Sequence, residues 1–458
     1  MRKKCLALAL ILSPLVSLYS LPGLDSSMRP LPDANIYQED FLQLARYVRL
    51  YHPGFGEQPL QAMTGDEYAA LVEKVYRELG PVSSASEAKV LISWFLEKMK
   101  DGHLSIIKAF DDVGYAPIGT WWFGDDLMVI NAGKSEYAGL LHKKITSIGG
   151  LPPLRLEGLV NECISADDSH LLFKRLFSPD LMLSEPFLSH FNLLDQTGCV
   201  AVSFTDGARE ETLSLRPNCG KPDSCAAVYR ACRNEVTRLD EGNRYEMLPD
   251  RPVIYLQLNV MHSHGYEEFF RDFFKEANAR KAKYLILDIR NNQGGSYEWC
   301  YEFLRYVVDR ERDVFLYNGW RANDRYGNER VEDGRHRVRP AEPGLRFQGR
   351  VFLLTSAKTF SAATFFPVAL KDNSLGLVVG EPVGNMSVRY GYMVPPIELA
   401  NTRWVFSTTS CIWERASPEA GARKDSYILP DEAVKITMDD YINRRDPAFE
   451  RVMELIGD

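Results

Sequence analysis

The first part of the chain has the hydrophobic pattern of three helices. Its first stretch repeats apolar residues at three- and four-residue spacing: Phe41, Leu44, Ala45, Val48 and Tyr51. Two further helices are expected to begin at Thr64-x-x-Glu67 and Ser84-x-x-Glu87, because this spacing matches the capping box. The third is expected to run to about residue 100, with Gly102 as its C-terminal cap.

Between about residues 106 and 252 the pattern changes to short alternating or apolar segments. Residues 127–130 and 199–204 are examples, and turn residues separate such segments. We therefore predict a mainly β middle region with some helix. The polar, cysteine-containing segment 217–243 is typical of an excursion or a linker.

From residue 253 onward, strands and helices alternate. Strands are expected at 253–258, 284–289, 350–355 and 377–380, and helices at 266–279, at 297–308 and from 361. Alternation of this kind predicts an α/β domain. The strands are apolar almost throughout, which indicates a sheet covered on both faces.

Length and charge narrow the range of functions. A chain of 458 residues with 45% hydrophobic content is too long for one core, so two or three domains are expected. The net charge of −8, with no long basic stripe, argues against nucleic acid and anionic membranes as partners.

The N-terminus has the pattern of a secretory signal peptide. Residues 1–4 carry three positive charges in Arg2, Lys3 and Lys4, and residues 5–18 are mostly apolar. We predict that residues 1–20 form this signal and that the protein is exported to the periplasm, the outer surface or the medium. No later segment is apolar and long enough to predict a membrane span.

The cysteines permit disulfides but do not predict a metal site. Cys219, Cys225 and Cys232 lie close together in a polar region, where a local disulfide is an open possibility. Their spacing lacks the paired C-x-x-C pattern of zinc sites, and His262 and His264 lack further ligands at suitable spacing. We expect neither a metal nor another cofactor.

Ser361 is the leading candidate nucleophile. It follows the apolar segment 351–354 at a predicted strand-to-helix turn, and its neighbours are small. Such a turn exposes the hydroxyl and presents free backbone N–H groups to an oxyanion. Gly294 and Gly295 end another buried strand, where they permit a sharp turn and close approach of a substrate. A plain tight turn is the alternative for this glycine pair.

Several segments together resemble the C-terminal processing peptidase and tricorn-type serine peptidase family, classed S41. They are 288–295, 355–363, Gly380-Glu381-x-x-Gly384 and Pro430-Asp431, in that order. Upstream, Asp101-Gly102-His103 resembles a further element of the family, His52-Pro53 a motif of its secreted bacterial branch, and 144–150 a strand of a PDZ-like module.

The resemblance implies a multidomain α/β protein. A helical domain is expected over residues 21–105, a PDZ-like β region over 106–250, and a crotonase- and ClpP-like α/β peptidase domain over 251–458. In that family either a lysine or a histidine activates the serine. The lysine branch carries a glutamate three residues after the serine and a lysine after the Gly-Glu element, where this chain has Thr364 and Met386.

His103 is therefore the predicted general base. It is expected just beyond a helix C-terminus, whose negative dipole end favours the imidazolium formed during acyl transfer. A capping or packing role is the alternative, and His52, His262 and His264 are competing candidates.

A carboxylate that orients the histidine is expected from triad logic. The family glutamate lies between the serine and the Pro-Asp element, where this chain offers Glu414, Glu419 and Asp425. The local motif is poorly kept. We select Glu419, with a solvated surface acid as the alternative for each candidate.

The resemblance also implies an oxyanion hole and a reaction. Its donors are expected to be the backbone N–H of Ala362 and one from the Gly294-Gly295 turn. Ser361 is expected to attack a peptide carbonyl while His103 removes its proton, giving an acyl-enzyme that water hydrolyses. The expected partner is a peptide or protein substrate, held as an added strand.

Two other hypotheses remain open. The first is a catalytically inactive protein that binds peptides or apolar ligands on the same scaffold, which the departures at Thr364 and in the 414–425 stretch allow. The second is crotonase-type acyl-thioester chemistry, which the predicted export and the serine motif argue against. Substrate preference and oligomeric state stay open.

Overall fold

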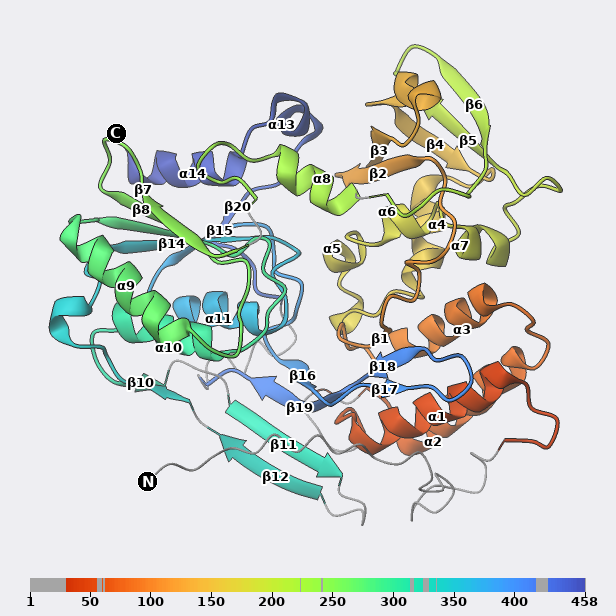
Figure 1. The fold of residues 1–458 in the computed structure, drawn as a ribbon, viewed down its shortest axis with the longest axis horizontal. Helices are drawn as coiled ribbons and strands as arrows, with labels where there is room; N and C mark the ends of the chain where they lie inside the picture. Colours follow the sequence, from red (N-terminus) through yellow and green to blue (C-terminus); the bar gives the residue numbers. More distant parts are fainter. Residues whose placement is uncertain are drawn as a thin grey trace.

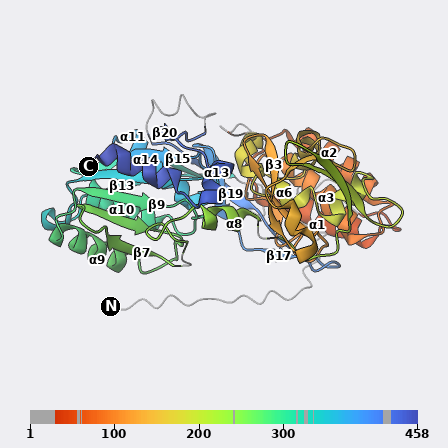
Figure 2. The same cartoon turned by 90° about the horizontal axis from the view of Figure 1, so that it is seen from above.

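The computed structural model describes residues 30–55, 60, 62–222, 224–239, 242–313, 317–323, 329–334, 336–416 and 427–457. The predicted signal peptide over residues 1–20 lies outside them. Helices and sheets form a mixed α/β structure, which confirms the predicted fold class (Figure 1). Seen from above, the chain forms two lobes with α8 (Ser224–Ala231) between them (Figure 2).

Three helices form where the sequence predicts them. They are α1 (Ile36–Tyr51), α2 (Gly65–Leu79) and α3 (Ala85–Glu97). The capping box at Thr64 and Glu67 is complete, whereas at Ser84 only the side chain accepts the N–H of Glu87. Their apolar faces meet in a common core around Phe41, Tyr68 and Phe95.

The middle region is built on a five-stranded antiparallel sheet in the order β2-β3-β4-β5-β6. Its strands are β2 (Ile118–Phe123), β3 (Asp126–Ala132), β4 (Lys144–Ile148), β5 (Val200–Thr205) and β6 (Glu210–Leu215). Its helical segments are η3 (Ser135–Leu140), α4 (Pro153–Asn161), η4 (Asp167–Ser169), α5 (Leu171–Lys174), α6 (Ser178–Leu181) and α7 (Glu185–His190). The expected strands form a sheet, but the helical segments hold about as many residues as the strands, so the prediction of a mainly β region is only partly right.

A six-stranded sheet in the order β20-β15-β14-β9-β8-β7 forms the C-terminal half. Its strands are β7 (Arg244–Met247), β8 (Val253–Gln257), β9 (Tyr284–Asp288), β14 (Arg350–Thr355), β15 (Leu377–Gly380) and β20 (Glu432–Ala433). Only the edge pair β7 and β8 is antiparallel among these pairings. The loop with Gly294 and Gly295 follows the carboxyl end of β9, and the loop with Ser361 follows the carboxyl end of β14.

Both faces of this sheet are covered, as the apolar strands predict. Leu285 and Leu287 of β9 pack into one core with α9 (Tyr266–Ala279), α10 (Glu298–Val307) and α11 (Phe365–Asp372). Ile286, between them, packs into a second core with α14 (Pro447–Ile456). This two-residue alternation places helices on opposite faces (Figure 1).

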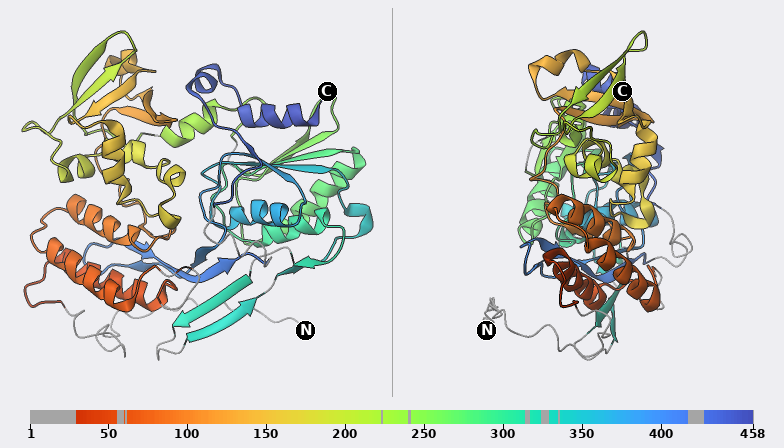
Figure 3. Two further views of the ribbon diagram at one scale, coloured as in Figure 1. Left: turned by 180° about the vertical axis from the view of Figure 1, so that it is seen from behind. Right: turned by 90° about the vertical axis from the view of Figure 1, so that its right-hand side faces the viewer.

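Strands from near the C-terminus return to the N-terminal helices, which the sequence analysis did not predict. The short strand β1 (Ser105–Ile106) pairs with β18 (Val405–Ser407), which pairs with β17 (Ile397–Glu398). Figure 1 and the view from behind in Figure 3 show β17 and β18 beside α1 and α3. Segments about 300 residues apart in the sequence therefore contribute to one small sheet.

A second antiparallel sheet has the order β12-β11-β19-β16. Its strands are β11 (Tyr317–Asn323), β12 (Glu329–Gly334), β16 (Arg389–Met393) and β19 (Thr409–Glu414). The remaining elements are β10 (Arg312–Asp313), β13 (Arg337–Val338), η5 (Pro343–Leu345), η6 (Ser361–Thr364) and α13 (Met438–Asn443).

The predicted linker contains α8, whose Tyr229 hydroxyl donates to Glu381 in the C-terminal half at 2.8 Å. No disulfide joins the cysteines of the described ranges, Cys219, Cys225 and Cys232 included. Among the helices described here, none has the length and apolar content to cross a bilayer.

Candidate active site

Ser361 lies at the predicted strand-to-helix turn. It begins η6, six residues after β14 ends, and α11 follows directly. Its φ of +53° is in the left-handed region, which costs free energy for any residue that carries a Cβ. The residue as a whole is partly exposed at this turn.

His103 meets Ser361 across 258 residues of sequence. Its Nε2 lies 3.1 Å from Ser361 Oγ, within hydrogen-bonding distance. The imidazole side chain is 7% exposed and packs against the ring of Phe360, with 4.7 Å between centroids. Two segments that lie far apart in the sequence thus bring a histidine and a serine together.

The predicted helix cap before His103 is wrong. Helix α3 ends at Glu97, and the next three N–H groups make tighter, three-residue hydrogen bonds, so the chain leaves the helix before Gly102. Close packing, rather than a helix cap, explains why a glycine is found at position 102. A Cβ there would lie 3.0 Å from the Phe360 ring and 3.3 Å from Asp167 Oδ1.

Asp101 occupies the position expected for the carboxylate of a triad. Its Oδ1 accepts from His103 Nδ1 at 2.9 Å and from the His103 backbone N–H at 2.9 Å, and its Oδ2 accepts from Thr409 Oγ1 at 2.7 Å. Burial alone would raise the pKa of this carboxyl, but the charge and hydrogen bond of His103 hold the pKa well below its usual range.

His52 lies on the other side of Asp101. Its Nε2 is 3.3 Å from Asp101 Oδ2, and its Nδ1 accepts the backbone N–H of Gly54 at 3.0 Å. Because Nδ1 is an acceptor here, the neutral ring carries its proton on Nε2, facing Asp101. His52 was a competing candidate for the base, but in the structure it contacts Asp101.

The glycine pair lies close to Ser361. Gly294 and Gly295 have φ values of +101° and +130°, and a Cβ on Gly294 would lie 2.7 Å from Ser361 Cβ. The Gly294 N–H already donates to Asn292 Oδ1 at 2.8 Å. Ala362 is the second residue of η6, where no carbonyl of the same turn can accept its N–H.

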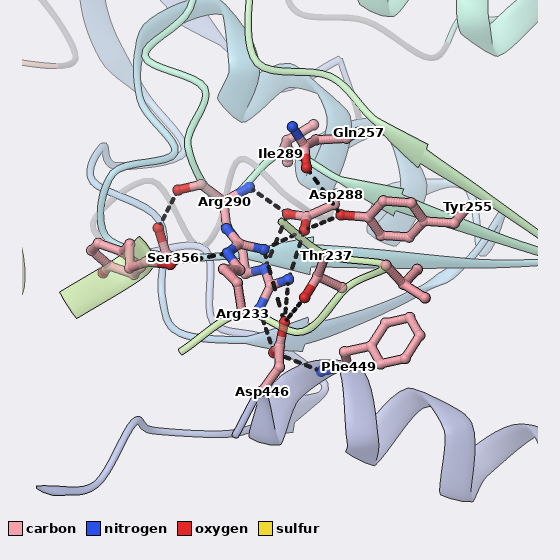
Figure 4. Close-up of polar contacts among 12 residues, drawn as sticks. Arg233, Thr237, Tyr255, Gln257, Asp288, Ile289, Arg290, Ser356, Asp446 and Phe449 are labelled. Atoms are coloured by element: carbon pink, nitrogen blue, oxygen red, sulfur yellow. Dashed lines mark hydrogen bonds and ion pairs between the residues drawn. The ribbon is translucent and has the colours of Figure 1, made fainter. Parts of the chain in front are cut away.

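A buried network of charges supports the strand end before these glycines (Figure 4). Arg290 donates to Asp288 and to Asp446, each at 2.6 Å, and Arg233 also donates to Asp288. Ser356 Oγ donates to the Arg290 carbonyl at 2.6 Å, which ties the loop before Ser361 to the loop after β9. This hydrogen bond fixes the position of one loop relative to the other.

Two cavities adjoin these loops. A cavity of about 660 Å³ is lined by Gly102 and Leu104, which flank His103, and by apolar side chains of the middle region. A cavity of about 570 Å³ lies against Gly294 and Gly295. The two share Gln293 and Lys358.

The other candidates lie elsewhere. Glu414 ends β19 and is paired with Tyr317, while Glu419 and Asp425 lie outside the described residues. His262 and His264 are exposed, with ring centroids 6.2 Å apart. Within the described ranges no three His, Cys, Asp or Glu side chains are grouped to hold a metal ion.

Residues 252–434, from β8 to β20, match the family model of Peptidase family S41. The match contains Gly294, Gly295 and Ser361. The segment of this chain from β8 to β20 belongs to peptidase family S41. The members of that family are serine-type peptidases, which are hydrolases. His103 and Asp101 lie outside the matched segment, so their placement beside Ser361 comes from the fold.

Similar proteins fit this assignment. Carboxyl-terminal-processing peptidase 2, chloroplastic, from Arabidopsis thaliana is 26% identical over 128 residues, which is 28% of this chain and 22% of that relative's length. This chain also resembles the structure of mature CPAF complexed with lactacystin, with a TM-score of 0.64 and 14% identity, covering 93% of this chain and 98% of the other. A second structure of mature CPAF gives 0.62 at 14% identity, covering 92% and 96%. At such identity the likeness supports the fold alone.

The role of Asp101 was missed although the Asp-Gly-His segment was noticed. Its spacing was a usable signal, since a residue two positions before a histidine can turn back to its Nδ1, as the 2.9 Å contact does here. Asn385 was missed as well. Its Oδ1 accepts the backbone N–H of Ser361, and it stands beside Met386, the position compared with the lysine of the other branch.

Proposed function

We propose that this chain is an exported serine peptidase that hydrolyses peptide bonds through an acyl-enzyme on Ser361, with His103 as general base. The observation that carries the proposal is the 3.1 Å contact between His103 Nε2 and Ser361 Oγ. A nucleophile and a base in hydrogen-bond reach, with a third group orienting the base, form the recurring arrangement of acyl transfer.

The first half of the reaction forms the acyl-enzyme. Ser361 Oγ attacks the carbonyl carbon of the scissile peptide, and His103 Nε2 takes the hydroxyl proton. The N–H of Ala362 and one from the Gly294-Gly295 turn are the proposed donors to the oxyanion. Gly294 must first exchange its hydrogen bond to Asn292, so Gly295 is the more readily available of the two. The imidazolium then protonates the leaving amine, and the C–N bond breaks.

The second half releases the acid. Water attacks the ester carbonyl while His103 takes its proton, and collapse of the intermediate returns the proton to Ser361 Oγ. Asp101 is the proposed orienting carboxylate. By accepting from Nδ1 it fixes the tautomer in which Nε2 is free to accept from Ser361, and it stabilises the imidazolium. Glu419 remains a prediction outside the described residues.

The proposed substrate is a peptide or protein segment lying across the loops around Ser361. The two cavities share Gln293, which precedes Gly294, and Lys358, which lies three residues before Ser361, and the larger cavity is lined mostly by apolar side chains. We propose cleavage near protein carboxyl termini, in keeping with the name of the chloroplastic relative. The domain limits of 21–105, 106–250 and 251–458 remain part of the proposal.

Export is the remaining element, and its support is the basic start and apolar stretch within residues 1–20. Expression of the whole chain in a bacterial host, followed by fractionation and N-terminal sequencing, tests it. We expect a product shortened near residue 20 outside the cytoplasm. A full-length product that stays in the cytoplasm contradicts export.

A fluorophosphonate probe tests the nucleophile directly. We expect it to label the wild-type protein on Ser361 and not to label Ser361→Ala. The matched control is Ser263→Ala, because Ser263 is an exposed serine whose Oγ also lies near a histidine ring, at 3.5 Å from His264 Nδ1. This control should label like the wild type.

Hydrolysis of a fluorescent casein completes the test. His103→Ala should abolish turnover with an unchanged thermal unfolding temperature, and near-normal turnover excludes His103 as the base. A folded wild-type protein that is never labelled supports the inactive binding protein instead. Turnover of acyl-thioesters but not of peptides supports crotonase-type chemistry.

A further inference from the structure

The backbone N–H and the backbone carbonyl of Ser361 both form hydrogen bonds with side chains. The N–H donates to Asn385 Oδ1, and the carbonyl accepts from Thr364 Oγ1 at 2.6 Å and from Arg389 Nη2 at 3.2 Å. A left-handed serine persists only when its surroundings fix it. Asn385 is therefore one of the groups that set the direction of the Ser361 hydroxyl.

Asn385 is itself oriented by Asp167, a residue of the middle region. Asp167 Oδ2 accepts from Asn385 Nδ2 at 2.9 Å and from the Met386 N–H at 3.1 Å. An ionised carboxylate can only accept hydrogen bonds, so the amide of Asn385 must turn its NH₂ toward Asp167 and its oxygen toward Ser361. The carboxylate thus determines which atom Asn385 offers to the nucleophile.

The same carboxylate reaches the segment that carries the base. Asp167 Oδ1 accepts the backbone N–H of Gly102 at 2.9 Å, directly before His103. Asp167 is 3% exposed, and its surroundings leave little room for the side chain to move. Its two oxygens therefore hold the segment of the base and the loop of the nucleophile at a fixed separation.

The backbone around Asp167 is strained. Asp168 and Ser169 have φ values of +44° and +64°, two successive left-handed residues that are not glycine. Lys100 Nζ donates to Ser169 Oγ at 2.9 Å and Tyr427 donates to the Asp168 carbonyl at 3.1 Å, which hold this turn in place. Strain maintained by several contacts is typical of a functional position.

We propose that Asp167 is a positioning residue that aligns Ser361 with His103, acting through Asn385 on one side and Gly102 on the other. The proposal rests on the proposed peptidase function. Burial and the charge of Asp101 raise the pKa of Asp167, while His103 and the hydrogen bonds from Gly102 and Asn385 oppose this rise. Both oxygens of Asp167 act as acceptors, for three N–H donors in all, and this geometry favours the carboxylate form.

The experiment is a double-mutant cycle with an exchanged pair. In Asp167→Asn the amide cannot accept on both sides, and in Asn385→Asp two carboxylates face each other. We expect each single variant to slow fluorophosphonate labelling of Ser361 and kcat for peptide hydrolysis roughly 100-fold, with little change in KM, because a small misplacement of the reacting atoms has this effect.

The double variant D167N/N385D restores the relay with donor and acceptor exchanged. The amide introduced at position 167 can donate to the carboxylate introduced at position 385, which can still accept from Ser361, although the Met386 N–H loses its acceptor. We therefore expect a partial recovery of about tenfold over the slower single variant. Asp168→Asn is the matched control, since Asp168 is the exposed neighbour, and it should label at the wild-type rate.

The outcomes are separable. The alignment role is overturned if the single variants label at the wild-type rate. It is also overturned if the fold-loss in labelling rate of the double variant equals the product of the two single fold-losses. A wild-type protein that is not labelled overturns the proposed function itself. If Asp167→Asn fails to fold, Asn385→Ala gives the same readout, with thermal unfolding reporting its folded fraction.

Discussion

Two buried clusters of aspartates lie in the molecule and differ in what surrounds the carboxylates. Asp288 and Asp446 face two arginines inside the C-terminal half (Figure 4). Asp101 and Asp167 lie between the helical, middle and C-terminal parts, and their partners are histidines, a threonine hydroxyl and N–H groups. All four side chains are at most 3% exposed.

The two clusters differ in the pKa values of their carboxyl groups and in whether their partners can give up a proton. In the first cluster burial alone would raise the pKa of both carboxyls, but Arg290 and Arg233 hold them below the usual range, and arginine keeps its proton. In the second cluster the pKa of Asp101 is lowered while that of Asp167 is raised. Environments that push the pKa values of neighbouring acids apart are typical of catalytic sites. The cluster of Asp288 and Asp446 with arginines stabilises the fold, whereas the cluster of Asp101 and Asp167 with histidines can exchange a proton.

The largest effect is expected from Asp101→Asn. The amide would donate to His103 Nδ1 and force the proton onto Nε2, which then cannot accept from Ser361. We expect kcat for peptide hydrolysis to fall by about 10⁴-fold with the fold retained. Steady-state kinetics and circular dichroism measure both quantities, and a loss below tenfold removes Asp101 from the proposed triad.

Asp446→Asn should affect stability rather than chemistry. It leaves the Arg290 and Arg233 cations with one carboxylate fewer in a buried site, so we expect a loss of about 3–5 kcal/mol in the free energy of unfolding. Urea unfolding measures this loss. Asp439→Asn, which alters an exposed pair with Arg445, is the control and should change stability by less than about 0.5 kcal/mol. A 100-fold fall in kcat of the folded Asp446 variant contradicts the division between the clusters.

The pH dependence of stability provides a third test, through His170. Its Nε2 donates to the Val383 carbonyl at 2.8 Å, in the loop that carries Asn385, and burial lowers its pKa to about 4. The unfolded chain binds this proton near pH 6.5, so the folded state loses stability as the pH falls from about 6.5 toward 4. At pH 5.0 the contribution should be about 2 kcal/mol below its value at pH 7.5.

His170→Gln removes this titration while Tyr427, which packs on the ring at 4.1 Å between centroids, and the neighbouring Asp167 and Asp168 remain. The difference between wild type and variant therefore isolates the histidine. Urea midpoints at the two pH values give it. Equal pH dependence in both proteins shows that His170 is not held neutral by the fold.

The smallest effect is expected from Thr409→Val. It removes the 2.7 Å hydrogen bond to Asp101 and should cost about 1.5 kcal/mol of stability, with a modest fall in kcat. The adjacent Thr408 is a matched control, because its buried Oγ1 has no hydrogen-bond partner among the described residues. Thr408→Val should be neutral or stabilising. Thermal unfolding compares them, and equal effects would show that the bond to Asp101 contributes nothing.

The features that sequence predicts here are local ones. The turn at Ser361, the glycine pair and the helices α1 to α3 follow from spacings within a few residues. Ser361 and His103 were selected from such signals and a resemblance, and the structure brings them within 3.1 Å.

The features that were missed depend on tertiary packing. Asp167 and Asn385 are ordinary polar residues in sequence, and only the packing of distant segments buries them and joins them at 2.9 Å. Strands of two and three residues, such as β1 and β18, carry too little periodicity to be recognised. Gly102 was taken for a helix cap because a contact with Phe360 leaves no trace in the local pattern.

The pairing of β1 with β18 has a consequence for the order of events during synthesis. When translation has passed Ser361, both Ser361 and His103 exist, but β18, which pairs with β1 just after His103, and Thr409, which donates to Asp101, have not yet been made. These contacts to the segment around His103 can form only after residues 405–409 have left the ribosome. A protein built in this way orders the surroundings of Ser361 and His103 late, when nearly all of its own chain has been completed.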